Sequence, residues 1–419
     1  MYALLDRAFR MVVKVGALRV SAPSGGPYAY GDGTGTPVCI RFTNEKAVRH
    51  VAIDADLALG EEYMSGGLVL EQGSLYDFLA LLMRNAGNAA DYPPLARLIY
   101  KFRVLLKRLD QYNPVGKARA NVAHHYDLSG SIYDLFLDRD RQYSCAYFED
   151  SRSSLDAAQL AKKRHLAAKL DIKPGMKVLD IGSGWGGLGL YLAEICGAEV
   201  TGVTLSQEQH KLSNERAAQR GLSERIQFRL LDYRQLNEKF DRIVSVGMFE
   251  HVGVGHYREF FAKCHALLKH DGIAALHSIN RSDGPGATSA WIKKYIFPGG
   301  YIPALSEVIP HLERERFYIT DVEILRLHYA ETLREWSKLF ADHRDRAREI
   351  YDERFCRMWE FYLAASEASF RHAGLNNFQI QFCKNQQTLP LTRNYIHQEE
   401  ERLRALESKQ PRLKSVPAE

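Results

Sequence analysis

The sequence has few cysteines for a chain of its length. Six cysteines are scattered over 419 residues, and no two of them form a C-x-x-C pair. This spacing excludes a disulfide framework of the kind that staples small secreted domains, and it argues against a structural zinc site. A reducing cytoplasm is the compartment that fits best, and we expect no metal.

Long apolar runs and strong charge are missing as well. No stretch approaches the roughly 18 apolar residues of a transmembrane helix, so any membrane contact should be peripheral. Asp6, Arg7, Arg10 and Lys14 interrupt the N-terminal stretch, which we therefore interpret as mature protein and not as a signal peptide. A net charge of +5 is too mild to predict nucleic-acid binding, although it favours anionic surfaces, membranes included.

Four segments are expected along the chain. Residues 1–95 predict a small α+β domain, because a basic amphipathic stretch is followed by the alternating segments GALRVSA and PVCIRFTN, with a turn-rich stretch between them. Prolines in DYPPL disfavour helix and place a linker at 96–120. Residues 121–400 are expected to form the catalytic domain, and the charged residues 401–419 a disordered tail.

Helix and strand patterns alternate from about residue 150 onward. Segments such as KVLDIG and EVTGVTLS have the apolar character of buried strands, and helical patterns separate them. Such alternation predicts an α/β fold with a parallel, doubly wound sheet, with function at the carboxyl ends of the strands. After residue 310 we expect mostly helix.

The stretch VLDIGSGWGG predicts a strand that runs into a ligand-binding turn. Gly182, Gly184 and Gly186 leave room for a ligand to approach the backbone at the start of the next helix. With Gly187, two of them also satisfy G-x-G-x-x-G, so a dinucleotide must be considered. Asp180 favours S-adenosylmethionine instead, because its carboxylate can bind the donor's amino group but would repel a pyrophosphate.

Three further positions bear on the same ligand. Asp232, in LLDYRQL, follows the third strand at a place suited to the adenine amine. The second strand ends at Thr204, where an acidic ribose ligand is common, so Thr204 and Gln209 would have to serve instead. Plainer interpretations stay open, with Asp180 as a strand-end cap and Gln209 as a solvated helix residue.

Several spaced blocks together resemble one family. The bacterial cyclopropane-fatty-acyl-phospholipid synthases and the related mycolic acid methyltransferases are similar to this chain over about residues 115–395. The blocks are HHYDLSGSIYDLFLD, YSCAYFED, VLDIGSGWGG, GVTLSQEQ, DYRQL, RIVSVGMFEHVG, LHSI, YIFPGG and HYAETLREW. The resemblance implies a Rossmann-like, class I S-adenosylmethionine-dependent methyltransferase domain with a mostly parallel, seven-stranded sheet.

The resemblance also implies roles for individual residues. A bicarbonate ion would be held by Cys145, Glu250, His277, Ile279 and Tyr329. Contacts to the methyl donor would come from Tyr143, Ser144, Gly182, Gly184, Thr204, Leu205, Gln209 and Asp232, with Tyr233 beside the adenine. His125 and Tyr133 align with residues near the reacting methyl group. Asn280 departs from the family pattern after H-x-I and leaves the shape of the pocket open.

The reaction of this family explains why these residue types suit the site. Methyl transfer to an isolated alkene leaves a carbocation, which aromatic faces can stabilise by roughly 0.5–2 kcal/mol each. The candidate rings, each of which could equally be a core residue, are Tyr143, Tyr147, Phe148, Tyr295, Phe297 and Tyr329. A small bound base avoids trapping the cation as an ester, with Glu250, His277 and Tyr329 orienting it.

Cys145 and the other polar candidates have simpler alternatives. Cys145 lies between two tyrosines in YSCAY, and we expect it to be a compact wall rather than a nucleophile, because methyl transfer needs no covalent enzyme intermediate. His277 could be a satisfied core histidine, and Glu250 could cap a turn.

The leading hypothesis is a synthase that methylenates unsaturated acyl chains of a phospholipid bilayer and gives cyclopropane fatty acids. The alternatives are a sibling enzyme with a methyl-branched or methylene product, a small-molecule methyltransferase, and an idle lipid-binding protein. The resemblance makes a homodimer plausible, located in the cytoplasm at the inner face of the membrane. The basic N-terminal helix would dock on lipid or, alternatively, pack internally.

Overall fold

The computed structural model describes residues 2–86, 94–111 and 130–410. The chain forms two compact units, which we call unit 1 and unit 2. Unit 1 consists of Met1–Tyr112, Arg281–Ile302 and Tyr329–Asn376, and unit 2 of Asn113–Asn280, Pro303–His328 and Asn377–Glu419. The two units interleave along the chain, whereas the division expected from the sequence is sequential.

Unit 1 contains a four-stranded sheet with the strand order β2-β1-β3-β4. Its strands are β1 (Leu18–Ala22), β2 (Gly25–Tyr30), β3 (Val38–Phe42) and β4 (Leu68–Gln72). β1 pairs antiparallel with β2 and parallel with β3. The two alternating stretches predicted as strands contain β1 and β3. β2 lies inside the stretch expected to consist of turns, because pairing with β1 overrides its glycines.

Helices complete unit 1. They are α1 (Tyr2–Val12), α2 (Glu45–Ile53), α3 (Ala55–Ser65), α4 (Leu75–Asn85), α5 (Pro94–Asp110), α12 (Ala290–Tyr295), α14 (His328–Asp342), α15 (Arg344–Ile350) and α16 (Glu353–His372). α16 packs against α3 and α4. Residues 96–110, which we expected in a linker, form most of α5. Its first residue is Pro94, in the first turn of the helix, where a missing backbone N–H is tolerated.

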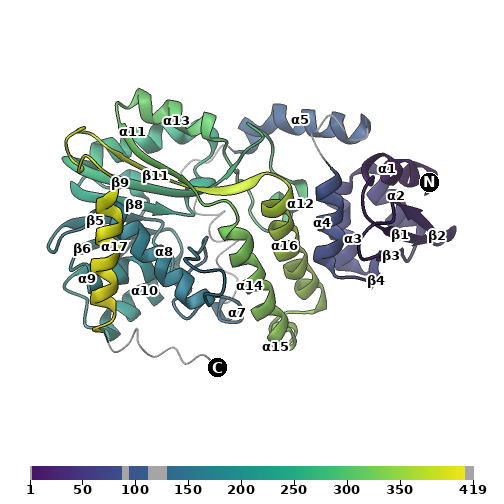
Figure 1. Cartoon of the computed structure of the whole chain (residues 1–419), viewed down its shortest axis with the longest axis horizontal. Helices are drawn as coiled ribbons and strands as arrows, with labels where there is room; N and C mark the ends of the chain where they lie inside the picture. The colour runs from purple at the N-terminus through teal and green to yellow at the C-terminus, as the bar shows by residue number, and fades with distance from the viewer. Residues whose placement is uncertain (1, 87–93, 112–129, 411–419) are drawn as a thin grey trace. The chain divides into compact units, whose positions relative to one another are not determined.

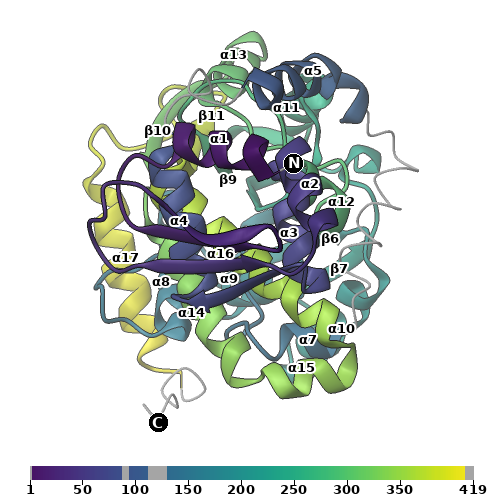
Figure 2. The ribbon, with the colours of Figure 1, turned by 90° about the vertical axis from the view of Figure 1, so that its right-hand side faces the viewer.

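The apolar face of α1 is turned into unit 1. Tyr2, Leu5 and Phe9 are buried, and the hydroxyl of Tyr2 lies 2.9 Å from that of Tyr30. The ring of Tyr2 also stacks on Tyr28, with 4.4 Å between the centroids. Figure 2 shows α1 beside the strands that it covers. Of the two interpretations left open by the sequence, internal packing therefore describes this apolar face.

Unit 2 contains the seven-stranded, mostly parallel sheet that was predicted, in the order β10-β11-β9-β8-β5-β6-β7. Its strands are β5 (Lys177–Ile181), β6 (Glu199–Thr204), β7 (Ile226–Leu230), β8 (Phe240–Val246), β9 (Leu268–Arg281), β10 (Tyr318–Ile324) and β11 (Leu375–Cys383). β5, β6, β7, β8 and β9 pair in parallel, and β10 pairs antiparallel with β11.

The expectation of mostly helix after residue 310 is wrong for β10 and β11. A strand signal is present in β11, where Phe378, Ile380 and Phe382 alternate with Asn377, Gln379 and Gln381. The buried amide side chains conceal it, because they do not resemble the apolar residues of a buried strand. The period of two is nevertheless regular.

Helices cover both faces of the large sheet. Figure 1 shows α8, α9, α10 and α17 on one face and α11 and α13 on the other, as a doubly wound fold requires. The helices of unit 2 are α7 (Gly130–Tyr133), α8 (Leu155–Lys169), α9 (Gly187–Ile195), α10 (Gln207–Gln219), α11 (Tyr257–Leu267), α13 (Leu305–Arg314) and α17 (Asn394–Glu407). Three short 3-10 helices are η2 (Tyr233–Gln235), η3 (Phe249–His251) and η4 (Val254–His256).

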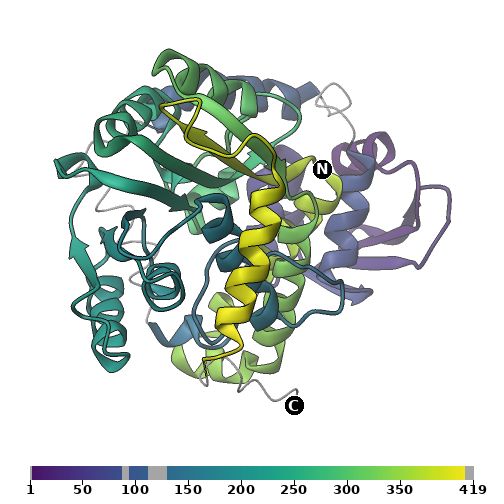
Figure 3. The same ribbon diagram turned by 60° about the vertical axis from the view of Figure 1, so that its left-hand side comes forward.

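Residues 401–407, which we expected in a disordered tail, form the second half of α17. This helix, yellow in Figure 3, packs against α8. Leu403 is buried, and the carboxylate of Glu407 accepts a 2.6 Å hydrogen bond from the hydroxyl of Tyr191. The many charges of this segment indicated solvent exposure, but one apolar face suffices to hold the helix.

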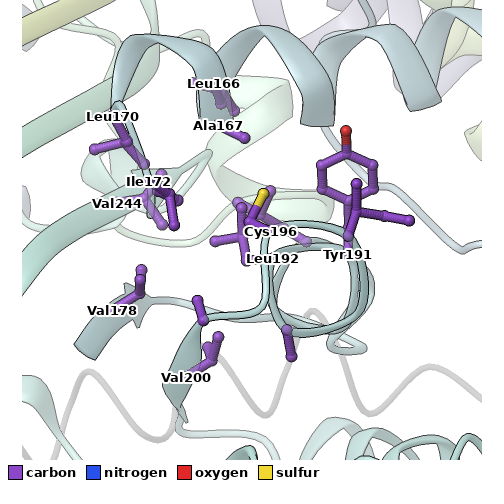
Figure 4. Packing of buried hydrophobic residues seen from close by; sticks show 14 of the residues in the cluster. Leu166, Ala167, Leu170, Ile172, Val178, Tyr191, Leu192, Cys196, Val200 and Val244 are labelled. Carbon is purple, nitrogen blue, oxygen red and sulfur yellow. The ribbon is translucent and has the colours of Figure 1, made fainter. Parts of the chain in front are cut away.

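One apolar cluster supports the strands that carry the site. Val178 of β5, Val200 of β6 and Val244 of β8 meet the inner faces of α8 and α9, including Leu166 and Leu192 (Figure 4). All five are buried. Close packing of this kind fixes the ends of the strands and the loops that follow them.

Candidate active site

Most residues expected at the site lie at the carboxyl edge of the seven-stranded sheet. Asp180 is close to the end of β5, Thr204 ends β6, and His277 lies toward the end of β9. In the register of the parallel pairs, Asp180 is opposite Val244 and His277 is opposite Val246. The strand ends are therefore level, and the structure brings these side chains to one edge.

The glycine-rich loop between β5 and α9 uses its glycines for two reasons. Gly184 has a φ of 53°, and no heavy atom of the described residues lies within 4 Å of the place for a Cβ. Gly182 and Gly186 have φ angles of 82°, and a Cβ would lie 2.7 Å from Met248 and 2.6 Å from Phe228, respectively. Packing thus requires these two glycines, whereas the backbone is open at Gly184.

Asp180 is a buried carboxylic acid. Only 2% of the residue is exposed, and Oδ2 has no hydrogen-bond partner in the part of the chain that the structure describes. Burial raises the pKa of Asp180 to about 7, and the positive charge of Lys162 opposes this rise. A buried carboxylate oxygen with unused hydrogen-bonding capacity is chemically suited to an ammonium group.

A hydrogen-bonded pair stands at the end of β6, where an acidic residue is common. Thr204 Oγ1 donates to Gln209 Oε1 over 2.8 Å, and both residues are buried. The hydroxyl of Ser206 caps α10 by accepting from the backbone N–H of Gln209. Gln209 is therefore not a solvated helix residue. The half-buried Leu205 lies between the two partners in sequence.

Asp232 is buried after β7, and its carboxylate is already bound to Arg234. Oδ1 accepts from the Arg234 backbone N–H and from Nε, and Oδ2 accepts from Nη2 over 2.7 Å. Tyr233 packs edge-on against Phe260, with 5.6 Å between the ring centroids. An adenine amine at Asp232 would have to share the carboxylate with this guanidinium. The sequence analysis did not identify Arg234, although this residue lies only two positions after Asp232 in the block DYRQL.

Two polar residues of α8 were also missed. Lys162 is fully buried and donates from Nζ to Gln142 Oε1 over 2.7 Å and to Ser144 Oγ over 2.8 Å. The amide of Gln159 donates to the carbonyl of Ser144 over 2.9 Å. The only signal in the sequence is the spacing of three residues, which puts both side chains on one face of the helix. These bonds fix the segment that carries Tyr143 and Cys145.

Cys145 is a buried residue in this structure. Its side chain is fully buried, and Sγ lies 3.3 Å from the carbonyl oxygen of Ala146. Tyr143 is half-buried and meets Tyr133 edge to face, with centroids 5.6 Å apart. Tyr147 stacks between the rings of His165 and His328. The thiol is therefore enclosed, and its role as a wall of the site stays a prediction.

Glu250 and His277 present two buried polar atoms near the end of β9. The backbone N–H of Ile279 donates to Glu250 Oε1 over 2.7 Å, while Glu250 Oε2 and His277 Nε2 have no partner within the described ranges. His277 and Ile279 are two residues apart and share one face of β9. Burial raises the pKa of Glu250 and lowers that of His277 well below its usual value.

Gln379 of β11 is the hydrogen-bond partner of His277 Nδ1. The amide nitrogen of Gln379 lies 3.1 Å from His277 Nδ1. With the amide assigned so that its nitrogen faces the ring, Nδ1 accepts, and the neutral ring then has its proton on Nε2. The site therefore offers a donor at His277 and an acceptor at Glu250. Because β11 was not predicted, neither was Gln379.

Three groups of predicted residues are not placed at this edge. Tyr329 belongs to unit 1 and packs there against Trp336 and Phe370. Tyr295 and Phe297 belong to unit 1 as well. His125 lies outside the described residues. Their roles stay predictions.

The fold and this edge define a class of protein. A doubly wound sheet carries a glycine-rich loop after β5, a buried acid near the end of that strand, and a second acid after β7. This arrangement is that of a Rossmann-like, S-adenosylmethionine-dependent methyltransferase. The residues fit such a donor, because Asp180 offers a buried acceptor for its ammonium group and the backbone is open at Gly184.

Comparisons with known proteins define the family. Residues 115–380 match the family described as mycolic acid cyclopropane synthetase, and the chain belongs to it. The cyclopropane-fatty-acyl-phospholipid synthase of Escherichia coli K12 is 37% identical over 350 residues, which are 83% of this chain and 88% of that protein. Tuberculostearic acid methyltransferase UfaA1 of Mycobacterium tuberculosis is 35% identical, over 84% of this chain and 86% of that protein.

A solved structure shows the same relationship. Mycolic acid cyclopropane synthase CmaA1, complexed with SAH and CTAB, superimposes with a TM-score of 0.60 at 34% identity. The match covers 65% of this chain and 99% of that chain.

We expect the affinity for S-adenosylhomocysteine, which has the same amino-acid end as the donor, to depend on pH through Asp180. The carboxylate form binds the ammonium group, so affinity should rise with pH up to about 7 and fall about tenfold per pH unit below it. Isothermal titration calorimetry between pH 5.5 and 8.5 measures this. Asp180→Asn should bind weakly at every pH; an unchanged slope in that variant would contradict the assignment.

Lys162→Met should move the same pH midpoint upward. The charge of Lys162 lowers the pKa of Asp180, so removing it favours the protonated acid. The same titration measures the midpoint, and Lys211→Met, at an exposed position on α10, is the matched control. A midpoint equal to that of the wild type would show that Lys162 does not act on this carboxylate.

Proposed function

We propose that this protein transfers a one-carbon unit from S-adenosylmethionine to the cis double bond of unsaturated acyl chains in membrane phospholipids, giving cyclopropane fatty acids. The observation that carries this proposal is the pair of buried, unpartnered atoms Glu250 Oε2 and His277 Nε2 at the carboxyl edge. These atoms provide a place for a proton-accepting ion without a covalent nucleophile.

The comparison with Escherichia coli supports the substrate. The relative named for acting on fatty-acyl phospholipid aligns with 83% of this chain, including residues outside the 115–380 family match, because 350 residues are aligned. The chain therefore shares most of that protein's length and not only the methyltransferase sheet. This extent favours a phospholipid over a small polar metabolite.

The chemistry places strict demands on the residues around the acyl chain. S-adenosylmethionine, when bound, supplies an electrophilic methyl carbon to the alkene electron pair, and the chain carries a cation until a methyl proton is lost and the ring closes. Nucleophiles must stay away from that cation. Cys145 meets this demand because its thiol is fully buried, with Sγ 3.3 Å from the carbonyl oxygen of Ala146.

Bicarbonate fits the polar atoms at the end of β9. Its O–H group can donate a hydrogen bond to Glu250 Oε2, and its other oxygens can accept a hydrogen bond from His277 Nε2–H. The backbone N–H of Ile279 keeps the Glu250 carboxylate in place, and Gln379 keeps the proton of His277 on Nε2. When bound, this ion supplies a small base for the methyl proton. Tyr329 is retained in the proposal as a further donor.

We also propose a homodimer that works as a peripheral protein at the inner face of the membrane. In the portion of the chain that the structure covers, no helix has the length and apolar character needed to cross a bilayer. Peripheral docking is then the way for the enzyme to reach an acyl chain.

A second product is supported by a specific comparison. UfaA1 is named a methyltransferase and not a cyclopropane synthase, yet its identity to this chain, 35%, is close to that of the Escherichia coli synthase. The sibling reaction uses the same two substrates when it stops at a methylene chain, and a saturated methyl-branched chain additionally requires a hydride donor that reduces the methylene group. Ring closure depends on which proton reaches the base, a matter of small differences in placement.

Mass spectrometry of membrane lipids tests the proposed function directly. In a bacterial host without its own synthase, expression should make unsaturated phospholipids heavier by one CH2 and remove the double bond. His277→Ala should produce none of this lipid, because the donor to the ion is lost. A product that retains unsaturation or gains two hydrogens would identify the sibling reaction, and unchanged lipids would contradict both.

Gln379→Leu tests the proposed bicarbonate site. Without the amide, the proton of His277 is no longer held on Nε2, so the bicarbonate concentration for half-maximal activity should rise about tenfold, the effect of one lost oriented hydrogen bond. Turnover is measured in degassed buffer with bicarbonate added back. Gln381→Leu removes another buried amide from the same face of β11 and is the matched control. If the turnover of the wild type does not change with the bicarbonate concentration, the ion has no role in the reaction.

A further inference from the structure

The amphipathic helix α5 has its faces reversed relative to an ordinary surface helix. Leu98, Phe102 and Leu105 are 65%, 60% and 77% exposed. Their spacing of four and three residues puts them in one stripe along the helix. An ordinary amphipathic helix buries such a stripe in the core, as α1 does in the same unit. The stripe of α5 is exposed to solvent instead.

Polar contacts hold α5 in this orientation. Arg103 forms ion pairs with Asp54 and Asp56, which lie at the start of α3. Lys107 donates to the hydroxyl of Tyr301 over 3.3 Å. Both cations are on the side of the helix away from the stripe, because they lie about half a turn from it. The polar side is thus anchored within unit 1, and the apolar side faces outward.

The charge of α5 favours one kind of partner. Between Pro94 and Asp110 the sequence has five basic residues (Arg97, Lys101, Arg103, Lys107 and Arg108) and one acidic residue, Asp110. Lys101 is exposed, three residues after Leu98 and four before Leu105, so it borders the stripe. Cationic side chains beside an exposed apolar stripe are typical of helices that lie in the interface of an anionic membrane.

We propose that α5 is an interfacial helix that inserts Leu98, Phe102 and Leu105 into the headgroup region of an anionic phospholipid bilayer. The inference rests on the proposed function, because a phospholipid-modifying enzyme must reach its substrate at a membrane surface. It also moves the docking element from the N-terminal helix, whose apolar face is buried, to α5. A helix of 17 residues is about 25 Å long and lies along the surface without spanning it.

Tryptophan fluorescence can locate the inserted residue. All four native tryptophans, at positions 185, 291, 336 and 359, are buried and provide a constant background. In the Phe102→Trp variant, the emission of the new tryptophan should shift to shorter wavelength when vesicles of mixed phosphatidylcholine and phosphatidylglycerol are added. Brominated acyl chains in these vesicles should quench that emission. Leu4→Trp, on the outer face of α1, and Leu391→Trp, in unit 2, replace residues that are 47% and 103% exposed and serve as matched controls. Quenching at Leu4→Trp but not at Phe102→Trp would overturn the proposal.

Binding measurements separate membrane docking from the other uses of the stripe. The triple variant Leu98→Ser, Phe102→Ser and Leu105→Ser should bind these vesicles at least about tenfold more weakly in sedimentation, with an unchanged melting temperature. Lys101→Glu, at an exposed position, should weaken binding to anionic vesicles but not to neutral ones, and it keeps the test valid if the triple variant misfolds. A triple variant that becomes monomeric by light scattering would show that the stripe is a subunit interface and would overturn the proposal.

Activity assays keep this inference distinct from the proposed function. The triple variant should lose turnover on vesicles but retain it on detergent-dispersed phospholipid with cis-unsaturated chains. If the wild type turns over vesicle lipid without insertion of α5, the inference is contradicted and the proposed function is not. Insertion of α5 without turnover on any lipid would leave the inference standing and contradict the proposed function.

Discussion

Three side chains at the end of the parallel sheet keep buried polar atoms without hydrogen-bond partners among the described residues, at a cost that the packing beneath them must offset. Asp180, Glu250 and His277 each keep a buried atom that no described residue satisfies. Each such atom costs roughly 1–3 kcal/mol of folding free energy. The fold tolerates this cost because the strands beneath are packed in an apolar cluster around Val178 and Val244. The same unpartnered atoms are free to form hydrogen bonds with a ligand.

Helix α8 links this edge to the rest of unit 2. Lys162, near its middle, holds the segment of Cys145, while Lys169 at its end is buried against Asp321 and Glu323 of β10. His165 connects Glu323 to Glu400 of α17. One buried helix with charged side chains thus fixes the segment beside the site, the antiparallel edge of the sheet and the last helix. Breaking one buried pair would leave an uncompensated charge inside the unit.

The two amphipathic helices of unit 1 show how context decides the use of one pattern. In α1 the apolar residues Leu5 and Phe9 are buried, and in α5 the equivalent stripe is exposed. The difference lies in the polar partners. Arg103 forms ion pairs with Asp54 and Asp56, and these hold the polar side of α5 inward and leave its apolar stripe outward. Helical periodicity gives the existence of a stripe but not the direction in which it faces.

Local patterns in the sequence predicted the class of fold, which the structure confirms, and they named candidate site residues whose roles stay predictions. Regular apolar strands, helical periods and the glycines around Asp180 are local signals, and residues 143–145, 204, 250 and 277 lie in recognisable blocks. Only the tertiary structure revealed Lys162, Arg234 and Gln379, together with the burial that raises the pKa of Asp180. A buried side chain acts through neighbours that are distant in sequence, such as the strand β11 beside β9. Those neighbours are decided by packing and leave no local pattern.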